Sequence, residues 1–166
     1  SAHGDVIRPV LAPISVEDVF PMTVEAFNVA EYYQTPVILL TDGDLGQRKE
    51  TAEPIDASNL QLVTRRTPTE KELEKYVRFR ITESGISPIS HPGMKGGNYL
   101  ASGIEHNESG APTANGEMHA KMNDKRLRKF APLKRRRDLL LAWETLFPTI
   151  GDFPVTWQTR AMVGSR

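Results

Sequence analysis

The sequence predicts an α/β fold with a parallel sheet, and three adjacent patterns carry this prediction. A short apolar stretch, Val10 to Ala12, has prolines on both sides. A stretch with helical periodicity follows over residues 15–33, and a continuous apolar run then extends from Val37 to Leu40. A strand, a helix and a strand in this order form a βαβ unit, in which the strands are parallel and the crossover is right-handed.

The middle of this unit carries signals for the start and the end of a helix. Ser15 suits the N-cap position, and Asp18 three residues later can return a hydrogen bond as in a capping box. Pro21 removes one backbone donor, so we expect a kink or a restart there. The helix is expected to end near Tyr33, before the break that Pro36 imposes.

The run from Val37 to Leu40 does not alternate between apolar and polar residues, which is typical of a strand covered on both faces. Its exit, Thr41 to Gln47, is polar and contains glycine. Ligands of open α/β sheets gather outside the carboxyl ends of the strands, so this exit is a candidate ligand-binding loop. An ordinary turn is the alternative. The parallel topology places this loop on the same edge of the sheet as Ser15.

The chain becomes polar after Arg48 and loses sustained periodicity. Residues 71–80 could hold a short helix, or an alternating strand from Tyr76 to Ile81. The segment 85–99 contains glycines and prolines throughout, which excludes a helix or a central strand there. Its apolar side chains are costly to leave in water, so we expect residues 85–108 to form an interface loop.

The last third of the chain is expected to contain two helices and a strand. Residues 115–130 show helical spacing of Met118, Met122 and Leu127. Pro132 suits the first position of a further helix over residues 133–147. Residues 151–157 then suggest a turn into a new strand.

Composition excludes several functional classes. The 166 residues carry 21 basic and 21 acidic side chains, so net charge indicates neither nucleic acid nor a membrane surface as a partner. Cysteine is absent, so this chain supplies no disulfide, no zinc thiolate and no iron–sulfur ligand. No apolar run approaches the roughly 20 residues of a membrane span, and no signal-peptide pattern opens the chain. We expect a soluble protein inside the cell, and a piece of a longer one because the chain begins without Met.

Three further patterns have two interpretations each. His91, His119 and the stretch 105–108 could be drawn as a metal site, but their spacing matches no zinc or di-iron signature, and we predict none. The glycines of residues 93–97 could cradle a phosphate, or could simply serve an interface loop. The basic run of residues 125–137 indicates either a solvated helix face or a docking patch for an acidic or phosphate-bearing partner.

A series of short motifs occurs in one fixed order over residues 3–130. The most distinctive are Gly85-Ile86-Ser87-Pro88 and Glu105-His106-Asn107-Glu108. The others include His3-Gly4-Asp5, Val10-Leu11-Ala12-Pro13, Ser15-Val16-Glu17-Asp18, Tyr33-Gln34-Thr35-Pro36-Val37-Ile38, Leu45-Gly46-Gln47, Pro92-Gly93 and Lys125-Arg126-x-Arg128-Lys129. This series closely resembles the alpha subunit of 2-oxoglutarate ferredoxin oxidoreductases.

The resemblance implies a thiamin-diphosphate-binding, pyrimidine-type parallel-sheet domain followed by a long irregular linker. It implies a cytoplasmic enzyme that oxidatively decarboxylates a 2-oxoacid, forms an acyl-CoA from coenzyme A and passes electrons to ferredoxin. Thiamine diphosphate with Mg²⁺ performs the carbanion chemistry, and a beta subunit carries the metal and the [4Fe–4S] clusters. We predict that Asp42, Gln47 and Arg48 bind cofactor, and that this chain contains no catalytic and no metal-binding residue.

The resemblance also predicts that the chain consists of three parts. Residues 1–50 are the second half of the pyrimidine-type domain, and residues 51–131 are an extended linker with interface loops. Residues 132–166 are a helix and the start of a following domain, divergent, truncated or frame-shifted. The family's activating glutamate and its Gly-Pro-Ser-Thr-Gly substrate loop belong upstream, so the isolated chain is predicted to be inactive and the preferred 2-oxoacid stays open. A sibling enzyme for pyruvate or branched 2-oxoacids and a non-catalytic binding module are the alternatives.

Overall fold

The structure, a computed structural model, describes residues 7–136 and 161–163. These residues form two compact units. The βαβ unit comprises residues 7–64, 132–136 and 161–163, and the loop unit comprises residues 65–131. The three-part division expected from the sequence stays a prediction.

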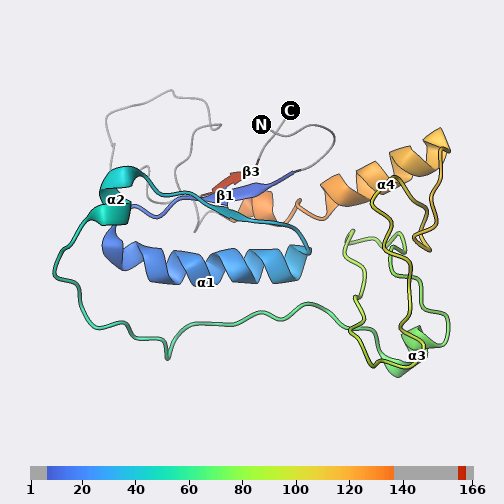
Figure 1. Cartoon of the computed structure of the whole chain (residues 1–166), viewed down its shortest axis with the longest axis horizontal. Helices are drawn as coiled ribbons and strands as arrows, with labels where there is room; N and C mark the ends of the chain where they lie inside the picture. The colour runs from blue at the N-terminus through green and yellow to red at the C-terminus, as the bar shows by residue number, and fades with distance from the viewer. Residues whose placement is uncertain (1–6, 137–160, 164–166) are drawn as a thin grey trace. The chain divides into compact units, whose positions relative to one another are not determined.

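The βαβ unit is built on a small sheet. Strand β1 (Pro9–Leu11) is followed by helix α1 (Val16–Tyr33) and strand β2 (Ile38–Leu39), and β1 and β2 pair in parallel. Strand β3 (Ala161–Val163) pairs antiparallel with β1, giving the order β2-β1-β3 among the described strands. Figure 1 shows α1 running along one face of this sheet. The predicted parallel βαβ unit is confirmed.

Both ends of α1 lie where the sequence signals them. The side chain of Ser15 accepts a hydrogen bond from Asp18 N. The Asp18 carboxylate accepts in return from Ile14 N at 3.0 Å, so the reciprocal bond of the cap reaches one residue before the N-cap. The helix ends at Tyr33, because Gln34 adopts the left-handed conformation with φ 50° and closes the last turn.

Pro21 does not restart α1, and this part of the prediction was wrong. The helix is continuous from Val16 to Tyr33. Pro21 lies in its second turn, where the missing N–H removes a single backbone hydrogen bond. Met22 and Val29 are buried on the face turned inward, and their burial offsets that loss.

Strand β2 is less covered than its apolar run predicts. Ile38 is 44% exposed and Leu40 is 52% exposed, so the expectation of a strand covered on both faces was wrong for the described part of the chain. The reason is position: β2 is the last described strand on its side of the sheet, whereas β1 lies between two neighbours. Leu11 of β1 is accordingly buried.

The loop unit contains two helices, α3 (Glu70–Leu73) and α4 (Gly116–Arg128), and otherwise turns and irregular chain. The alternating strand considered for residues 76–81 does not form. Residues 85–99 contain neither helix nor strand, as predicted. Asn115 caps α4 by accepting from Met118 N at 2.9 Å, which confirms the helix predicted for residues 115–130.

Side-chain donors hold the irregular backbone of the loop unit in place. Ser87 Oγ donates to the Arg80 carbonyl at 2.7 Å, and Ser90 Oγ donates to the Gly97 carbonyl at 2.5 Å. From α4, Lys125 Nζ donates to the Phe79 carbonyl at 2.9 Å. These bonds replace the ladder that a sheet would have provided.

Lys125 is only 8% exposed, so the interpretation of the basic run as a solvated helix face was wrong at this position.

After α4 in the sequence, the 3₁₀ turn η1 spans Leu133–Arg135. The helix predicted for residues 133–147 does not continue through Arg136, whose backbone is not helical (ψ 87°), so this part of the prediction was wrong. Its later residues, and the strand predicted within 151–157, lie outside the described residues. Among the described residues, no helix is long and apolar enough to cross a membrane.

Gly85 offers a direct test of the packing between α4 and the loops. Its φ is +77°, and a Cβ there would lie 2.6 Å from the Lys125 carbonyl oxygen. We expect Gly85→Ala to destabilise the chain by several kcal/mol, because strain adds to a backbone clash. Gly93→Ala is the matched control, since Gly93 also has a positive φ but open space around it.

The control is expected to lose only about 1–2 kcal/mol, the cost of the left-handed conformation. Thermal or urea unfolding of both variants measures the difference. Equal losses in the two variants would contradict the close approach of α4 to this turn.

Candidate functional site

The loop that follows β2 contains the residues predicted to bind cofactor. Helix α2 (Gly43–Gln47) is a single short helix, and Asp42 caps it by accepting from Leu45 N at 2.7 Å. Because β1 and β2 are parallel, this loop and Ser15 lie at the carboxyl edge of the sheet. Asp42, Gln47 and Arg48 are all exposed there. The structure thus brings the three residues together on one element, and their role stays a prediction.

Arg48 is held by carboxylates on both sides. It forms an ion pair with Asp44 one turn earlier and lies 3.6 Å from the Glu50 carboxylate. The hydrogen bond and the charge of Asp44 raise the pKa of Arg48 above its ordinary value. The loop therefore presents more carboxylate than cation, which suits a ligand with N–H donors better than a phosphate.

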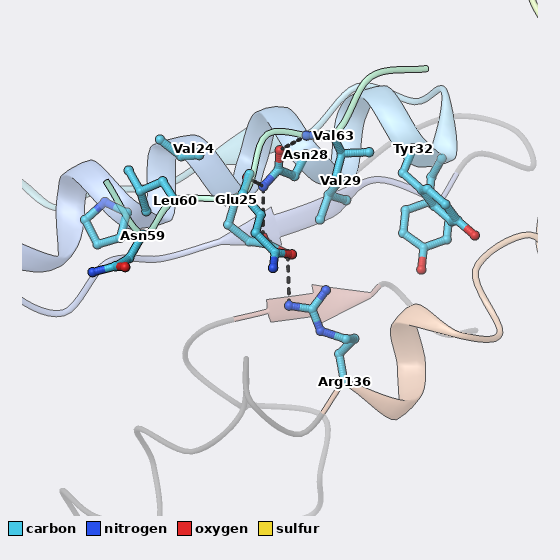
Figure 2. Close-up of a pocket in the computed structure, with 12 residues that line it drawn as sticks. Val24, Glu25, Asn28, Val29, Tyr32, Asn59, Leu60, Val63 and Arg136 are labelled. Carbon is cyan, nitrogen blue, oxygen red and sulfur yellow. Dashed lines mark hydrogen bonds and ion pairs between the residues drawn. The ribbon is translucent and has the colours of Figure 1, made fainter. Parts of the chain in front are cut away.

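A cavity of about 530 Å³ opens between α1 and the segment 59–63 (Figure 2). Asn28 spans its wall, donating to the Gln61 carbonyl at 2.8 Å and accepting from Val63 N at 2.8 Å. Glu25 lies 3.1 Å from Arg136 at the other side. Asn28 thereby anchors the segment 59–63, which has no regular structure, to helix α1.

A second polar cluster joins α4 to the loop before it. His119 Nδ1 lies 2.6 Å from Glu105 Oε2, and Arg126 lies 3.4 Å from the same oxygen. Burial alone would raise the pKa of Glu105, but the hydrogen bond from His119 and the charge of Arg126 outweigh it and lower that pKa. The cluster fixes Glu105 against α4.

Of the residues considered as a metal site, only His119 and Glu105 come together, and His91 and His106 have other partners. His91 and His106 each bond the carbonyl oxygen of a neighbouring residue, at 3.0 Å and 2.9 Å. The ring of His106 also packs against the Phe79 ring in a tilted arrangement, with centroids 4.1 Å apart. Within residues 7–136 and 161–163, no group of three or more His, Cys, Asp or Glu side chains could hold a metal ion.

Two of the glycines of residues 93–97 have packing roles. A Cβ on Gly96 would lie 2.9 Å from the Leu73 carbonyl oxygen, and one on Gly97 would lie 2.8 Å from the Ser90 side chain. The Gly97 N–H already donates to the Met94 carbonyl at 3.0 Å. Close approach explains Gly96 and Gly97 but not Gly93, which has open space around it, and the packing of Gly96 and Gly97 favours the interface-loop interpretation over a phosphate cradle.

The sequence did not reveal which α4 cations turn inward. Lys125 and Lys129 both have a pKa lowered to about 8, first by burial and then by the positive charge of Arg78. A signal in the sequence is nevertheless present, because Met118, Met122, Lys125 and the C-cap Lys129 recur at helical spacing and so share one stripe of α4 and its end.

Residues 2–125 match the family model described as "Pyruvate flavodoxin/ferredoxin oxidoreductase, thiamine diP-bdg". A subunit of 2-oxoglutarate synthase from Methanocaldococcus jannaschii, KorA, is 30% identical over 143 residues, which cover 86% of this chain and 37% of that protein. Subunit alpha of 2-oxoacid:ferredoxin oxidoreductase 2 from Aeropyrum pernix is 35% identical over 138 residues, covering 82% and 21%.

A solved structure is also similar. It is the 2-oxoglutarate:ferredoxin oxidoreductase from Magnetococcus marinus with 2-oxoglutarate, coenzyme A and succinyl-CoA bound. The TM-score is 0.76 at 36% identity, over 81% of this chain and 23% of that one. The chain therefore spans between about a fifth and a little more than a third of the length of these relatives.

The two inward lysines predict how stability depends on pH. Each releases its proton near pH 8 in the folded chain and near its ordinary value of 10.5 when unfolded. Between these values the unfolded chain binds more protons, so the free energy of unfolding rises with pH. We expect a gain on the order of 1 kcal/mol from pH 7.5 to 9.5.

Thermal unfolding across this pH range measures the gain, and Lys125→Met or Lys129→Met should reduce it. Lys121→Met is the control, because Lys121 is exposed on the same helix and paired with Glu117. A pH profile that is identical in all four proteins would show that the inward lysines are not responsible.

Proposed function

The chain belongs to the family of pyruvate flavodoxin/ferredoxin oxidoreductases, in their thiamine diphosphate-binding domain, and from this premise we propose that it acts within an alpha subunit of 2-oxoglutarate:ferredoxin oxidoreductase. The observation that carries the proposal is the 36% identity and common fold with a solved enzyme named for that substrate. The reaction removes CO₂ from the 2-oxoacid, transfers the acyl group to the thiol of coenzyme A and passes two electrons to ferredoxin. The proposed location is the cytoplasm.

Thiamine diphosphate, when bound, supplies the carbanion chemistry of this reaction. The exposed loop of Asp42, Gln47 and Arg48 supports a contribution to the organic part of the cofactor, because it offers carboxylate and amide acceptors at the carboxyl edge of the sheet. Arg48 is engaged by Asp44 and Glu50, which makes it a poor partner for a pyrophosphate.

The remaining groups are proposed to be held elsewhere. No described cluster of this chain fits Mg²⁺, and the sequence contains no cysteine for a [4Fe–4S] cluster. We assign the pyrophosphate, its Mg²⁺ and the clusters to a beta subunit. The division of labour requires that alpha and beta subunits meet at the site.

Two other functions remain in competition. A sibling enzyme for pyruvate or branched 2-oxoacids would keep the same domain, since the relatives include enzymes named only for 2-oxoacids. A non-catalytic binding module would keep the scaffold without activity. Substrate competition between 2-oxoglutarate, pyruvate and a branched 2-oxoacid separates the first alternative from the proposal, and activity of any kind excludes the second.

The experiment uses the full-length alpha subunit that carries this sequence, purified with its beta subunit. We expect reduction of ferredoxin or viologen that requires coenzyme A and is fastest with 2-oxoglutarate. The isolated 166-residue chain is expected to show none. Activity of the isolated chain, or an inactive full complex with its cofactors bound, would contradict the proposal.

Gln47 tests the proposed cofactor loop. In the full complex, Gln47→Ala is expected to weaken thiamine diphosphate binding about tenfold, which corresponds to about 1.4 kcal/mol. Lys49→Ala is the matched control, because Lys49 is an exposed neighbour outside α2. Titration of the apo complex with the cofactor, followed by calorimetry, distinguishes them. Unchanged affinity in both variants would remove this loop from the cofactor site.

The interface loop of residues 85–108 gives a separate test. Tyr99 and Leu100 expose apolar surface, and Tyr99 also packs edge-on against Phe79 with centroids 6.1 Å apart. We expect Tyr99→Ala combined with Ile86→Ala to weaken alpha–beta assembly while the affinities for coenzyme A and thiamine diphosphate stay within about twofold. Sedimentation measures assembly. Normal assembly with coenzyme A binding weakened tenfold would favour the phosphate-cradle alternative.

A further inference from the structure

Asn115, the N-cap residue of α4, is followed by Gly116, and this is the one Asn-Gly pair in the sequence. Both residues are exposed to solvent. Open space surrounds Gly116, since a Cβ added there would meet no neighbouring part of the chain within 4 Å. The pair is therefore accessible to water.

The place of the pair in α4 leaves the reacting atoms available. In an Asn-Gly sequence the backbone nitrogen of glycine can attack the side-chain carbonyl carbon of asparagine, because glycine has no Cβ to hinder the approach. The nitrogen must first lose its proton. Gly116 is the first residue of α4, and the N–H of a first helical residue has no acceptor within the helix. No helical hydrogen bond therefore has to break before the attack.

The other asparagines of the chain lack this combination. Asn123 lies inside α4, where the N–H of the following residue belongs to the helical hydrogen bonds. Asn28 uses its side-chain amide to hold Gln61 and Val63. The residues that follow the other asparagines all carry a Cβ, and they are Val29, Leu60, Tyr99, Glu108 and Asp124.

We infer that Asn115 is a site of spontaneous deamidation that modifies the start of α4. The Gly116 nitrogen forms a bond to Asn115 Cγ, and the bond from Cγ to Nδ2 breaks. The side-chain nitrogen leaves as ammonia, and the amide proton of Gly116 passes through solvent to it. Water then opens the cyclic succinimide, at Cγ to give aspartate or at the main-chain carbonyl carbon to give isoaspartate. Water is consumed and ammonia released, and nothing is oxidised or reduced.

The two products differ in their effect on α4. Asn115 Oδ1 accepts from Met118 N at 2.9 Å, and the Asn115 carbonyl accepts from His119 N at 3.0 Å. Aspartate keeps both acceptors and adds a negative charge at the helix N-terminus, where such a charge is stabilising. Isoaspartate inserts one more carbon into the main chain and displaces both acceptors. The first turn of α4 should then open, and the 2.6 Å contact of His119 with Glu105 should be lost.

The rival account is that the cap protects Asn115. The bond to Met118 N holds the side-chain oxygen, so the ring closes only in molecules whose cap is open. A single capping bond is weak enough to be open in roughly a tenth of the molecules at any moment. We therefore expect the cap to slow the reaction and not to prevent it.

The test incubates the 166-residue chain, folded and unfolded in guanidinium, at a mildly alkaline pH that promotes loss of the amide proton. Peptide mapping by mass spectrometry with electron-transfer fragmentation measures aspartate and isoaspartate at position 115. We expect the folded chain to react at roughly a tenth of the unfolded rate or faster. Asn98 and Asn107, exposed or half-exposed controls, should stay intact in the folded chain over the same time.

Gly116→Ala is the matched variant, because open space accommodates the added methyl group and alanine favours a helix. It should stay folded and react at least about tenfold more slowly than the wild type. Asn115→Asp contains one of the two products and should keep the melting temperature of the fresh wild type. The incubated wild type, which also contains isoaspartate, should melt at a lower temperature, whereas incubated Gly116→Ala should not.

Three results would overturn the proposal. A folded rate below about a hundredth of the unfolded rate would show that the cap protects Asn115. Equal rates in Gly116→Ala and the wild type would show that the glycine is not responsible. An unchanged melting temperature in wild type that contains isoaspartate would show that the reaction does not alter α4.

Discussion

Irregular backbone carries carbonyl groups that must find donors, and this requirement organises the loop unit. Residues 74–115 contain no helix and no extended strand, so their carbonyls cannot be satisfied by a ladder. Side chains supply the donors instead: a serine hydroxyl reaches the Arg80 carbonyl, and the phenol of Tyr76 reaches that of Pro88. Helix α4 contributes the charged donors, Lys125 to Phe79 and Arg128 to Thr82. Lys125 of α4 is therefore part of the interior of this unit, and Arg128 reaches into its edge.

The βαβ unit satisfies its backbone groups in a different way, through regular secondary structure. Its backbone groups are paired along β1 and within α1, and few side chains are needed to complete them. One exception is Asn28, whose amide holds the segment 61–63 in the way that a neighbouring strand would. The candidate cofactor loop lies at the carboxyl edge of this regular scaffold, where its exposed polar residues do not disturb the sheet.

The sequence predicted those features that depend on neighbouring residues. Ser15 and Asp18 determine the start of α1 as predicted, because caps act within a single turn. The caps Gln34 and Asn115, which were not predicted, close the same helix and begin α4. The exposure of the Ile38 side chain could not be predicted, because the apolar pattern of a strand does not show whether that strand lies at the edge of its sheet. The contact of Glu105 with His119 also depends on how a loop folds back onto α4. The three residues predicted to bind cofactor were chosen from topology alone, and their role stays a prediction.

The central claim is that α4 stabilises the irregular loops through its inward cations. Hydrogen–deuterium exchange, resolved by residue, tests it most directly in Lys125→Met compared with Lys121→Met. If the claim holds, Lys125→Met loses protection over residues 76–90, while the amides of α1 and β1 exchange as in the wild type. Unchanged protection of residues 76–90, or an equal loss in both variants, would contradict the account.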